Sequence, residues 1–299
     1  MTDIENFNQL VERAMADKDL RHMRPVVAKE LLHYDILFSL DKDKLLDTLI
    51  FQGGTSLRLC YGSPRFSEDL DFVGGKDFSS SKIYGIKECI EKYIGNRYGL
   101  EIDVKEPSET VMLPESADII VNKWQVRITT SPERKDLPKQ KIKIEVVNVP
   151  AYSRVPQAIR QNYDFLPDGY EDTLVMVETL DEVMADKIVS LVACQRYVRH
   201  RDIWDLRWLK QQGANLNIDY VFSKVQDYRI EFYQEKLEDM INRLGDIIHS
   251  KPFMDEMSRF IPTNVQERTL KKDKFLDFLV NENKTLLQAV LNSSKNRSL

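Results

Sequence analysis

The order of apolar and polar positions divides the chain into a mixed first part and a helical second part. Up to residue 48 the apolar residues recur at helical spacing, as at Leu31, Leu32, Ile36 and Leu37. Ser80–Arg97 carries the same kind of apolar stripe and predicts an amphipathic helix. The N-terminal region is therefore expected to supply helices that cover a sheet.

Short apolar or alternating runs predict the strands of that sheet. Residues 49–51 and 69–72 lie on either side of a predicted helix at Thr55–Tyr61. Three later strand-like segments are Leu100–Lys105, Trp124–Thr130 and Lys141–Val149. The loop around Pro132 and Pro138 is expected to join the last two as a hairpin.

Beyond Pro150 the pattern changes to helices. A connection bearing proline and tyrosine runs to about Asp172, and the polar residues 292–299 form a predicted tail. The predicted helices between them are Leu180–Tyr197, Asp202–Gln212, Ile218–Phe222, Glu231–Ile248, Met254–Phe260 and Asp273–Leu291. We predict an α+β protein, with a mixed sheet flanked by helices in residues 1–170 and an all-helical domain in residues 171–299.

Composition places the chain among soluble globular proteins. Of its 299 residues, 42% are hydrophobic and 30% charged, and no run of about 18 apolar residues predicts a membrane span. The acidic, polar stretch 1–19 does not have the pattern of a targeting segment. Cys60, Cys89 and Cys194 lack metal-ligand spacing and are expected to be buried thiols of a cytoplasmic protein. The four scattered histidines do not favour a histidine-ligated metal.

Charge is distributed unevenly, although the net charge is -5. Between residues 123 and 160 basic side chains far outnumber acidic ones. These basic residues are Lys123, Arg127, Arg134, Lys135, Lys139, Lys141, Lys143, Arg154 and Arg160. This surface could dock a polyanion, or it could be an ordinary solvated strand face.

Two carboxylates on alternate residues follow a glycine pair in one short segment. If residues 69–72 form a strand, Asp69 and Asp71 share one face. Two adjacent carboxylates repel each other unless a cation lies between them, and Mg²⁺ prefers oxygen ligands. Gly53 and Gly54 allow backbone N–H groups to approach phosphate at a helix start. The combination indicates phosphoryl or nucleotidyl transfer.

Residues 51–72, FQGGTSLRLCYGSPRFSEDLDF, resemble the signature of AbiEii-type nucleotidyltransferases. These are toxins of bacterial abortive-infection and toxin–antitoxin pairs, within the DNA polymerase β-like superfamily. The resemblance implies a polymerase β-like N-terminal domain. It also implies that Asp69 and Asp71 bind two Mg²⁺ ions together with a third carboxylate. Glu145 is our candidate for that third ligand, and Asp103 is its competitor.

The same motif supplies candidate nucleotide-binding residues. They are Gly53, Gly54, Thr55, Ser56, Arg65 and Ser67. The glycines, Arg65 and Ser67 also have a structural interpretation. The glycines could form a tight turn, Arg65 could brace Glu68, and Ser67 could stabilise a turn.

Two segments of the helical part also resemble family elements: LDEVMADKIVSLVACQR at 180–196 and RHRDIWDL at 199–206. Lys187 is the candidate that contacts nucleotide phosphates. Asp202 or Asp205 is the expected active-site acid, although Asp202 could instead cap a helix. Three arginines could contact RNA or line a solvated face: Arg196, Arg199 and Arg201.

The resemblance implies transfer of a nucleoside monophosphate from an NTP to RNA, with the 3′ end of tRNA as the favoured acceptor. The expected outcome in the cell is growth arrest that serves antiviral defence, and a cognate antitoxin would restrain it. Two alternatives stay open at this point. The acceptor could be a hydroxyl of a protein or small molecule, or the chain could bind nucleotide without turnover.

Overall fold

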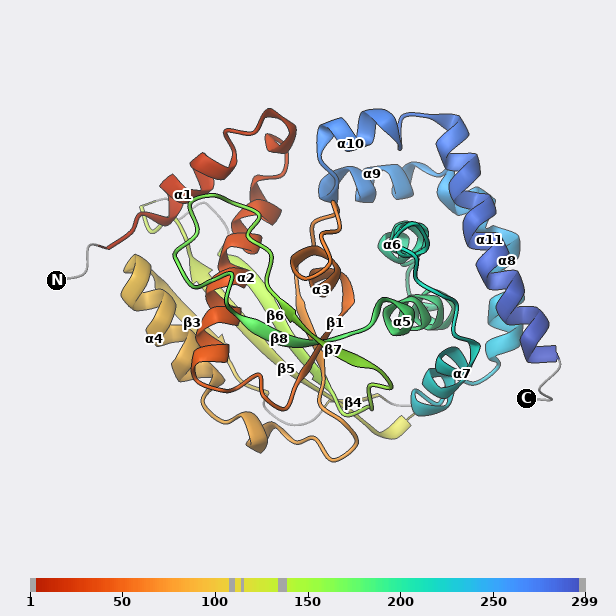
Figure 1. Ribbon diagram of the computed structural model, residues 1–299, viewed down its shortest axis with the longest axis horizontal. Helices are drawn as coiled ribbons and strands as arrows, with labels where there is room; N and C mark the ends of the chain where they lie inside the picture. Colours follow the sequence, from red (N-terminus) through yellow and green to blue (C-terminus); the bar gives the residue numbers. More distant parts are fainter. Residues whose placement is uncertain (1–3, 108–110, 114–115, 134–138, 296–299) are drawn as a thin grey trace. The chain divides into compact units, whose positions relative to one another are not determined.

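The structure is a computed structural model that describes residues 4–107, 111–113, 116–133 and 139–295. Contacts within the backbone group the chain into two compact units, Met1–Val177 and Glu178–Leu299. The first unit contains the sheet and the second contains helices, which confirms the predicted α+β class (Figure 1). The division into functional domains at residue 170 stays a prediction.

The first unit is built on a mixed sheet with strand order β3-β5-β6-β2-β1-β8-β7, and β4 pairs with β5. β2 runs parallel to β6 and antiparallel to β1, whereas β1 runs parallel to β8. The strands are β1 (Ile50–Gln52), β2 (Leu70–Val73), β3 (Glu101–Lys105), β4 (Val111–Leu113), β5 (Ser116–Thr129), β6 (Gln140–Val147), β7 (Arg154–Ala158) and β8 (Leu174–Glu178). The motif strand β2 therefore lies in the interior of the sheet.

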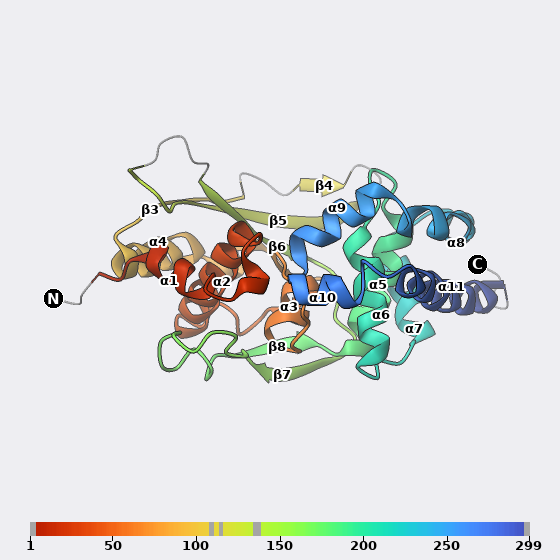
Figure 2. The same cartoon turned by 90° about the horizontal axis from the view of Figure 1, so that it is seen from above.

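Helices cover one face of this sheet. The helices of the first unit are α1 (Phe7–Ala14), α2 (Arg24–Lys42), α3 (Gly53–Leu59) and α4 (Ile86–Tyr98). α2 packs against α4 and β6, as Figure 2 shows from above. On β6 the side chains of Ile142, Ile144 and Val146 are fully buried, and those of Lys143 and Glu145 are only half-buried. The alternation predicted for this strand is confirmed, and the polar side chains occupy the opposite face.

Several boundaries in the first unit differ from the predictions for local reasons. Gly85 has a left-handed backbone (φ 105°), which divides the predicted helix 80–97 into a 3-10 turn at Ser80–Ile83 and α4. The helix predicted from Thr55 begins at Gly53 instead. The pairing of β5 with β6 confirms the predicted hairpin, although Pro138 lies outside the described residues, as do Arg134 and Lys135 of the basic stretch.

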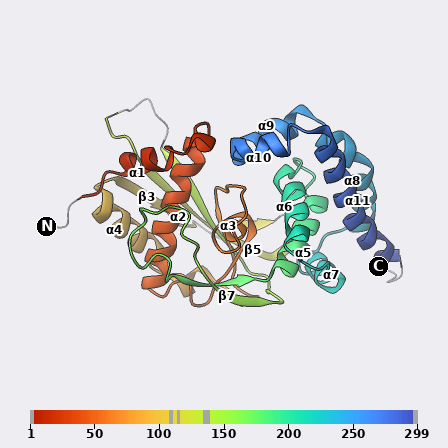
Figure 3. The same ribbon diagram turned by 45° about the horizontal axis from the view of Figure 1, so that its top comes forward.

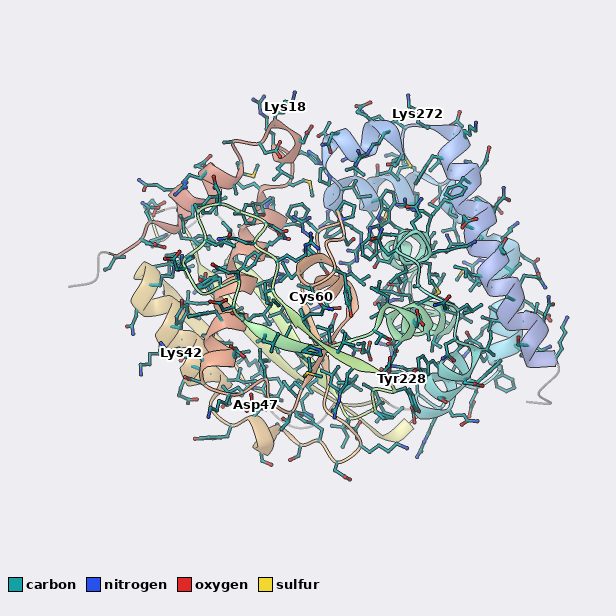
Figure 4. All side chains as sticks on the ribbon, viewed as in Figure 1. Lys18, Lys42, Asp47, Cys60, Tyr228 and Lys272 are labelled. Atoms are coloured by element: carbon teal, nitrogen blue, oxygen red, sulfur yellow. The ribbon has the colours of Figure 1, made fainter. Side chains whose placement is uncertain are left out.

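Three strands were absent from the prediction. β7 lies in the stretch that was predicted to be an irregular connection, and β4 and β8 are similarly short. Short apolar runs without clear alternation do not distinguish a strand from a loop. Of the cysteines, Cys60 and Cys89 are buried as expected, but Cys194 is only half-buried. Burial raises the pKa of Cys60, labelled in Figure 4 at the end of α3, to about 12.

After the end of β8, the described residues of the second unit form helices and the turns that join them. They are α5 (Leu180–Ala193), α6 (His200–Gln211), α7 (Ile218–Asp227), α8 (Tyr233–Ile248), α9 (Lys251–Phe260), α10 (Thr263–Arg268) and α11 (Asp273–Lys295). α5 packs against α6 and α7, and α8 lies beside α11 (Figure 3). None of the described helices is long and apolar enough to cross a membrane.

The second unit differs from the prediction at the end of α11 and in a helix that the prediction lacked. α11 continues through the predicted polar tail to Lys295, and its apolar residues Val290 and Leu291 are buried. α10 was not predicted at all, because six residues with one buried position give no helical period. Packing in the folded unit, rather than the local sequence, determines where α11 ends and that α10 forms.

Candidate active site

The two acidic side chains of the motif lie on one face at the start of β2. Asp69 directly precedes the strand and Asp71 is within it, and both side chains are half-buried. Leu70 and Phe72 point the other way and are almost fully buried. This arrangement confirms the alternation that the sequence predicted.

The parallel strand β6 places Glu145 beside this pair. Glu145 is the direct Cα partner of Asp71 between β2 and β6. Asp103 lies on β3, opposite Arg127 of β5, and two strands separate β3 from β2. Because neighbouring strands lie about 4.8 Å apart, the backbone at Asp103 is roughly 14 Å from β2. The sheet therefore brings Glu145, and not Asp103, next to Asp71.

Gly53 gives Asp71 the space that its carboxylate occupies. Gln52 at the end of β1 is the Cα partner of Asp71, and Gly53 follows it as the first residue of α3. Gly53 has a left-handed backbone (φ 78°), and a Cβ there would lie 2.9 Å from Asp71 Oδ2. Only glycine adopts this conformation at this distance from the carboxylate without strain.

The hydroxyls of Thr55 and Ser56 are directed at backbone carbonyls. Thr55 Oγ1 donates to the carbonyl of Asp69, and Ser56 Oγ donates to that of Gly53 at 2.9 Å. Both side chains are buried. These bonds tie α3 to the acidic segment, and the predicted contact of the two hydroxyls with a triphosphate stays a prediction.

Arg65 is buried behind the glycine turn, with 2% of its surface exposed. Its Nη1 donates to the carbonyl of Phe66 at 2.7 Å. A Cβ on Gly54 would lie 2.5 Å from Arg65 Nη2 and 2.9 Å from Ser67 Oγ. Arg65 and Ser67 thus line the turn from behind, a position that supports its shape. Their predicted role in nucleotide binding stays a prediction.

Helix α2 holds the residue before Asp69 by two contacts that the sequence did not reveal. Lys29 Nζ lies 2.7 Å from Glu68 Oε1, so Glu68 pairs with Lys29. His33 Nε2 lies 3.0 Å from the carbonyl of Glu68 and must be the donor, because a carbonyl only accepts. Burial lowers the pKa of His33 to about 4, so this histidine is neutral at pH 7. Contacts between residues more than 30 positions apart leave no signal in local spacing.

In the second unit Lys187 meets both candidate acids. Its Nζ lies 2.7 Å from Asp202 Oδ1 and 3.1 Å from Asp205 Oδ2, and all three side chains are buried. Ser190 Oγ also donates to Asp202 at 2.6 Å. Lys187 is therefore not a solvated lysine, since its amino group lies among buried side chains of α5 and α6.

The electrostatics of this cluster favour a charged Asp202. Burial alone would raise the pKa of Asp202, but the charges of Lys187 and Arg199 and two hydrogen bonds hold it well below its usual range. Asp202 is the third residue of α6, whose N-cap is Arg199, so the alternative of Asp202 as the cap is wrong. Arg201, one of the three arginines that could contact RNA or line a solvated face, has its Nε 3.5 Å from a carboxylate oxygen of Glu256.

A second buried cluster centres on Lys224 of α7, one turn before Tyr228, which Figure 4 labels. Lys224 Nζ lies 2.7–3.0 Å from the carboxylates of Glu178, Glu182 and Asp186. Burial and the neighbouring Asp186 raise the pKa of Glu178 well above its ordinary value and favour its protonated form. The adjacent residues 186 and 187 thus serve two different ion clusters.

Carboxylate oxygens are gathered most tightly in that second cluster. Among the described residues, Glu178, Glu182 and Asp186 form the one set of three such side chains with ligand atoms within 4.8 Å of one another. Lys224 already lies among them. Asp69, Asp71 and Glu145 share one face of neighbouring strands but do not converge to that distance.

Comparison with known families identifies the chain. A family model described as the nucleotidyl transferase AbiEii toxin of a type IV toxin–antitoxin system matches residues 35–281. The chain belongs to this family. The match spans most of both compact units, so AbiEii membership rests on much more of the sequence than the motif.

Two solved structures are similar to this AbiEii chain. One is JHP933 from Helicobacter pylori, with 19% identity and a TM-score of 0.40, covering 91% of this chain and 94% of that chain. The other is an H. pylori protein provisionally assigned as a nucleotidyltransferase, with 19% identity and a TM-score of 0.41, covering 94% and 97%. No curated protein matches this sequence.

Membership fixes the general activity. The protein is a nucleotidyltransferase toxin of a type IV toxin–antitoxin system, and its family implies an NTP substrate, a divalent metal and an antitoxin. The predictions of family and enzyme class are confirmed.

Proposed function

We propose that this chain transfers a nucleoside monophosphate from an NTP to the 3′ end of an RNA, with tRNA as the acceptor. The observation that carries the proposal is the placement of Asp71 and Glu145 as direct neighbours on β2 and β6, with Asp69 on the same face. The Gly53 turn lies against this group. The basic face of β5 and β6 supports a polyanionic acceptor.

The residues of this face fit a divalent metal. Asp69, Asp71 and Glu145 offer carboxylate oxygens, the ligands that Mg²⁺ prefers. The missing Cβ of Gly53 keeps Asp71 Oδ2 unobstructed on that side. Bound Mg²⁺ would neutralise triphosphate charge and favour attack by an acceptor hydroxyl. We assign Asp69, Asp71 and Glu145 as its ligands.

The other residues around the motif would contribute by holding the backbone of the site in place. Thr55 and His33 fix the backbone around Asp69 from two sides, through the carbonyls of Asp69 and Glu68. Backbone N–H groups of Gly53 and Gly54 would meet phosphate oxygens, and Arg65 supports the turn that presents them. Positioning and charge neutralisation supply most of the rate in such transfers.

We further propose that Lys187 is required for transfer. Its two aspartate partners hold its amino group in place at 2.7 and 3.1 Å, and lysine is a common ligand of phosphate oxygens. Asp202 also accepts hydrogen bonds from Ser190 and Arg199, so the Lys187 pair is part of a wider buried network.

The acceptor is tested by label transfer. Purified protein is incubated with Mg²⁺, each α-labelled NTP in turn, and a mixture of total RNA and cell protein. The proposal expects label in RNA of tRNA size, removable by an enzyme that trims 3′ ends. Label in protein or in a small molecule would instead establish the alternative acceptors, and label nowhere would support a binding module.

A further inference from the structure

Two lysines form ion pairs with two of the three carboxylates assigned to the metal. Lys143 Nζ lies 3.7 Å from Asp69 Oδ2, and the Lys143 backbone N–H donates to Asp69 Oδ1 at 3.1 Å. Lys123 Nζ lies 2.7 Å from Glu145 Oε1. The pairs follow from strand register, because Lys123 is the Cα partner of Glu145 between β5 and β6.

These ammonium groups compete for the oxygens that a divalent ion needs. Mg²⁺ binds oxygens at about 2.0–2.1 Å, so an ion on the same oxygen would lie about 4–5 Å from the ammonium. At that distance a dication and an ammonium repel by about 2 kcal/mol even in water. The ammonium of Lys143 or Lys123 and the ion therefore compete for the same oxygen.

The lysines are also able to leave. The side chains of Lys143 and Lys123 are both 45% exposed. Exposed ion pairs of this kind contribute little to stability. The lysine amino group also lies at the end of a flexible side chain. Lys187 and Lys224 differ, because their side chains are 8% and 0% exposed within several fixed contacts.

We propose that Lys143 and Lys123 are exchangeable counter-ions of the active-site carboxylates. When a divalent ion binds, their ammonium groups release Asp69 and Glu145 and turn to phosphate oxygens of the nucleotide. Each lysine thereby holds a carboxylate in place before metal binding and contacts substrate after it. This inference rests on the proposed metal role of Asp69, Asp71 and Glu145.

Metal binding itself tests the exchange. Mn²⁺, as MnCl2, is titrated into the full-length protein and into Lys143→Met, Lys123→Met and Lys141→Met, with affinity read by calorimetry. Lys141 is the matched control, because it lies two residues from Lys143 on the same strand face and belongs to neither ion pair. Circular dichroism confirms folding, and either of the two test variants alone is sufficient if the other does not fold.

Removal of a competing ammonium should tighten Mn²⁺ binding about three- to ten-fold in Lys143→Met and Lys123→Met, and less than about two-fold in Lys141→Met. At saturating Mn²⁺ the same two variants should bind NTP more weakly than the control does. Equal Mn²⁺ affinity in test and control variants, or weaker Mn²⁺ binding in the test variants, would overturn the exchange.

A fifth protein separates this inference from the proposed function. Asp71→Asn removes one assigned metal ligand and neither of the two lysines. If Asp71→Asn binds Mn²⁺ as the natural sequence does, the proposed metal site itself is wrong. If Asp71→Asn loses Mn²⁺ while the lysine variants match Lys141→Met, only the exchange is wrong.

Discussion

The turn at Gly53 gives the sharpest test of how the fold positions the active-site carboxylates. In Gly53→Ala the new Cβ would meet Asp71 Oδ2 at 2.9 Å, whereas ordinary contacts begin near 3.4 Å. The carboxylate must therefore move by about 0.5 Å (3.4 minus 2.9) or the turn must open. The left-handed backbone adds about 1–2 kcal/mol of strain for any residue with a Cβ.

Gly75 provides a control that separates the two effects. It has nearly the same backbone angle (φ 80° against 78° at Gly53), but nothing lies within 4 Å of its added Cβ. Gly75→Ala should therefore bear the backbone strain alone. Any further loss in Gly53→Ala reports the displacement of Asp71.

Gly53→Ala and Gly75→Ala should differ strongly in the rate of transfer and little in thermal stability. Because a misplacement of about 1 Å can cost a factor of about 100, a shift of half that size should lower kcat/KM about ten-fold or more. Both variants should melt at similar temperatures. The assay measures transfer of labelled NMP to the acceptor with Mg²⁺, alongside thermal unfolding. Equal transfer by Gly53→Ala and Gly75→Ala would refute the claim that Gly53 makes room for Asp71.

Three further predictions concern groups inside each unit. The pKa of His33 is about 4 in the folded protein against 6.5 for a free histidine, so the unfolded chain takes up this proton at a higher pH. The contribution of His33 to stability is therefore full above about pH 6.5 and falls by about 3 kcal/mol as the pH falls to 4. His33→Gln keeps the N–H donor without titrating, so its urea midpoint should stay flatter over that range; an equal slope would contradict the assignment. Lys224→Met leaves buried carboxylates without their counter-ion and should lower the free energy of unfolding by about 3–5 kcal/mol, measured by urea denaturation, whereas a loss below about 1 kcal/mol would show that the cluster is not structural. Lys187→Met should lower transfer at least about ten-fold even where calorimetry shows a folded protein, and unchanged transfer would remove Lys187 from the mechanism.

The sequence predicted the local pattern of the motif strand better than the contacts around it. Strand alternation alone placed Asp69 and Asp71 on one face, because period-two patterning is a local property. The choice between Glu145 and Asp103 could not be made locally, since both lie on alternating strands. It needed the strand order, which places β6 next to β2 and β3 two strands further away.

The supporting contacts were beyond sequence reasoning for a similar reason. Lys29 and His33 reach Glu68 across more than 30 residues, and Lys224 meets Glu182 across more than 40. Nothing in the local pattern of these residues distinguishes them from solvated side chains. The resemblance identified Lys187, but only packing revealed that it is buried between two aspartates.

The central claim is that the carboxylates on β2 and β6 carry metal-dependent nucleotidyl transfer. One measurement tests it directly: initial rates of NMP transfer at saturating Mg²⁺ for Asp71→Asn, Glu145→Gln and the control Asp103→Asn. The first two changes should lower the rate about 100-fold or more, because each removes an assigned metal ligand. Asp103→Asn should retain most of the rate, since Asp103 lies on β3, away from β2. Full transfer by Asp71→Asn, or loss of transfer in Asp103→Asn with Glu145→Gln unaffected, would contradict the account.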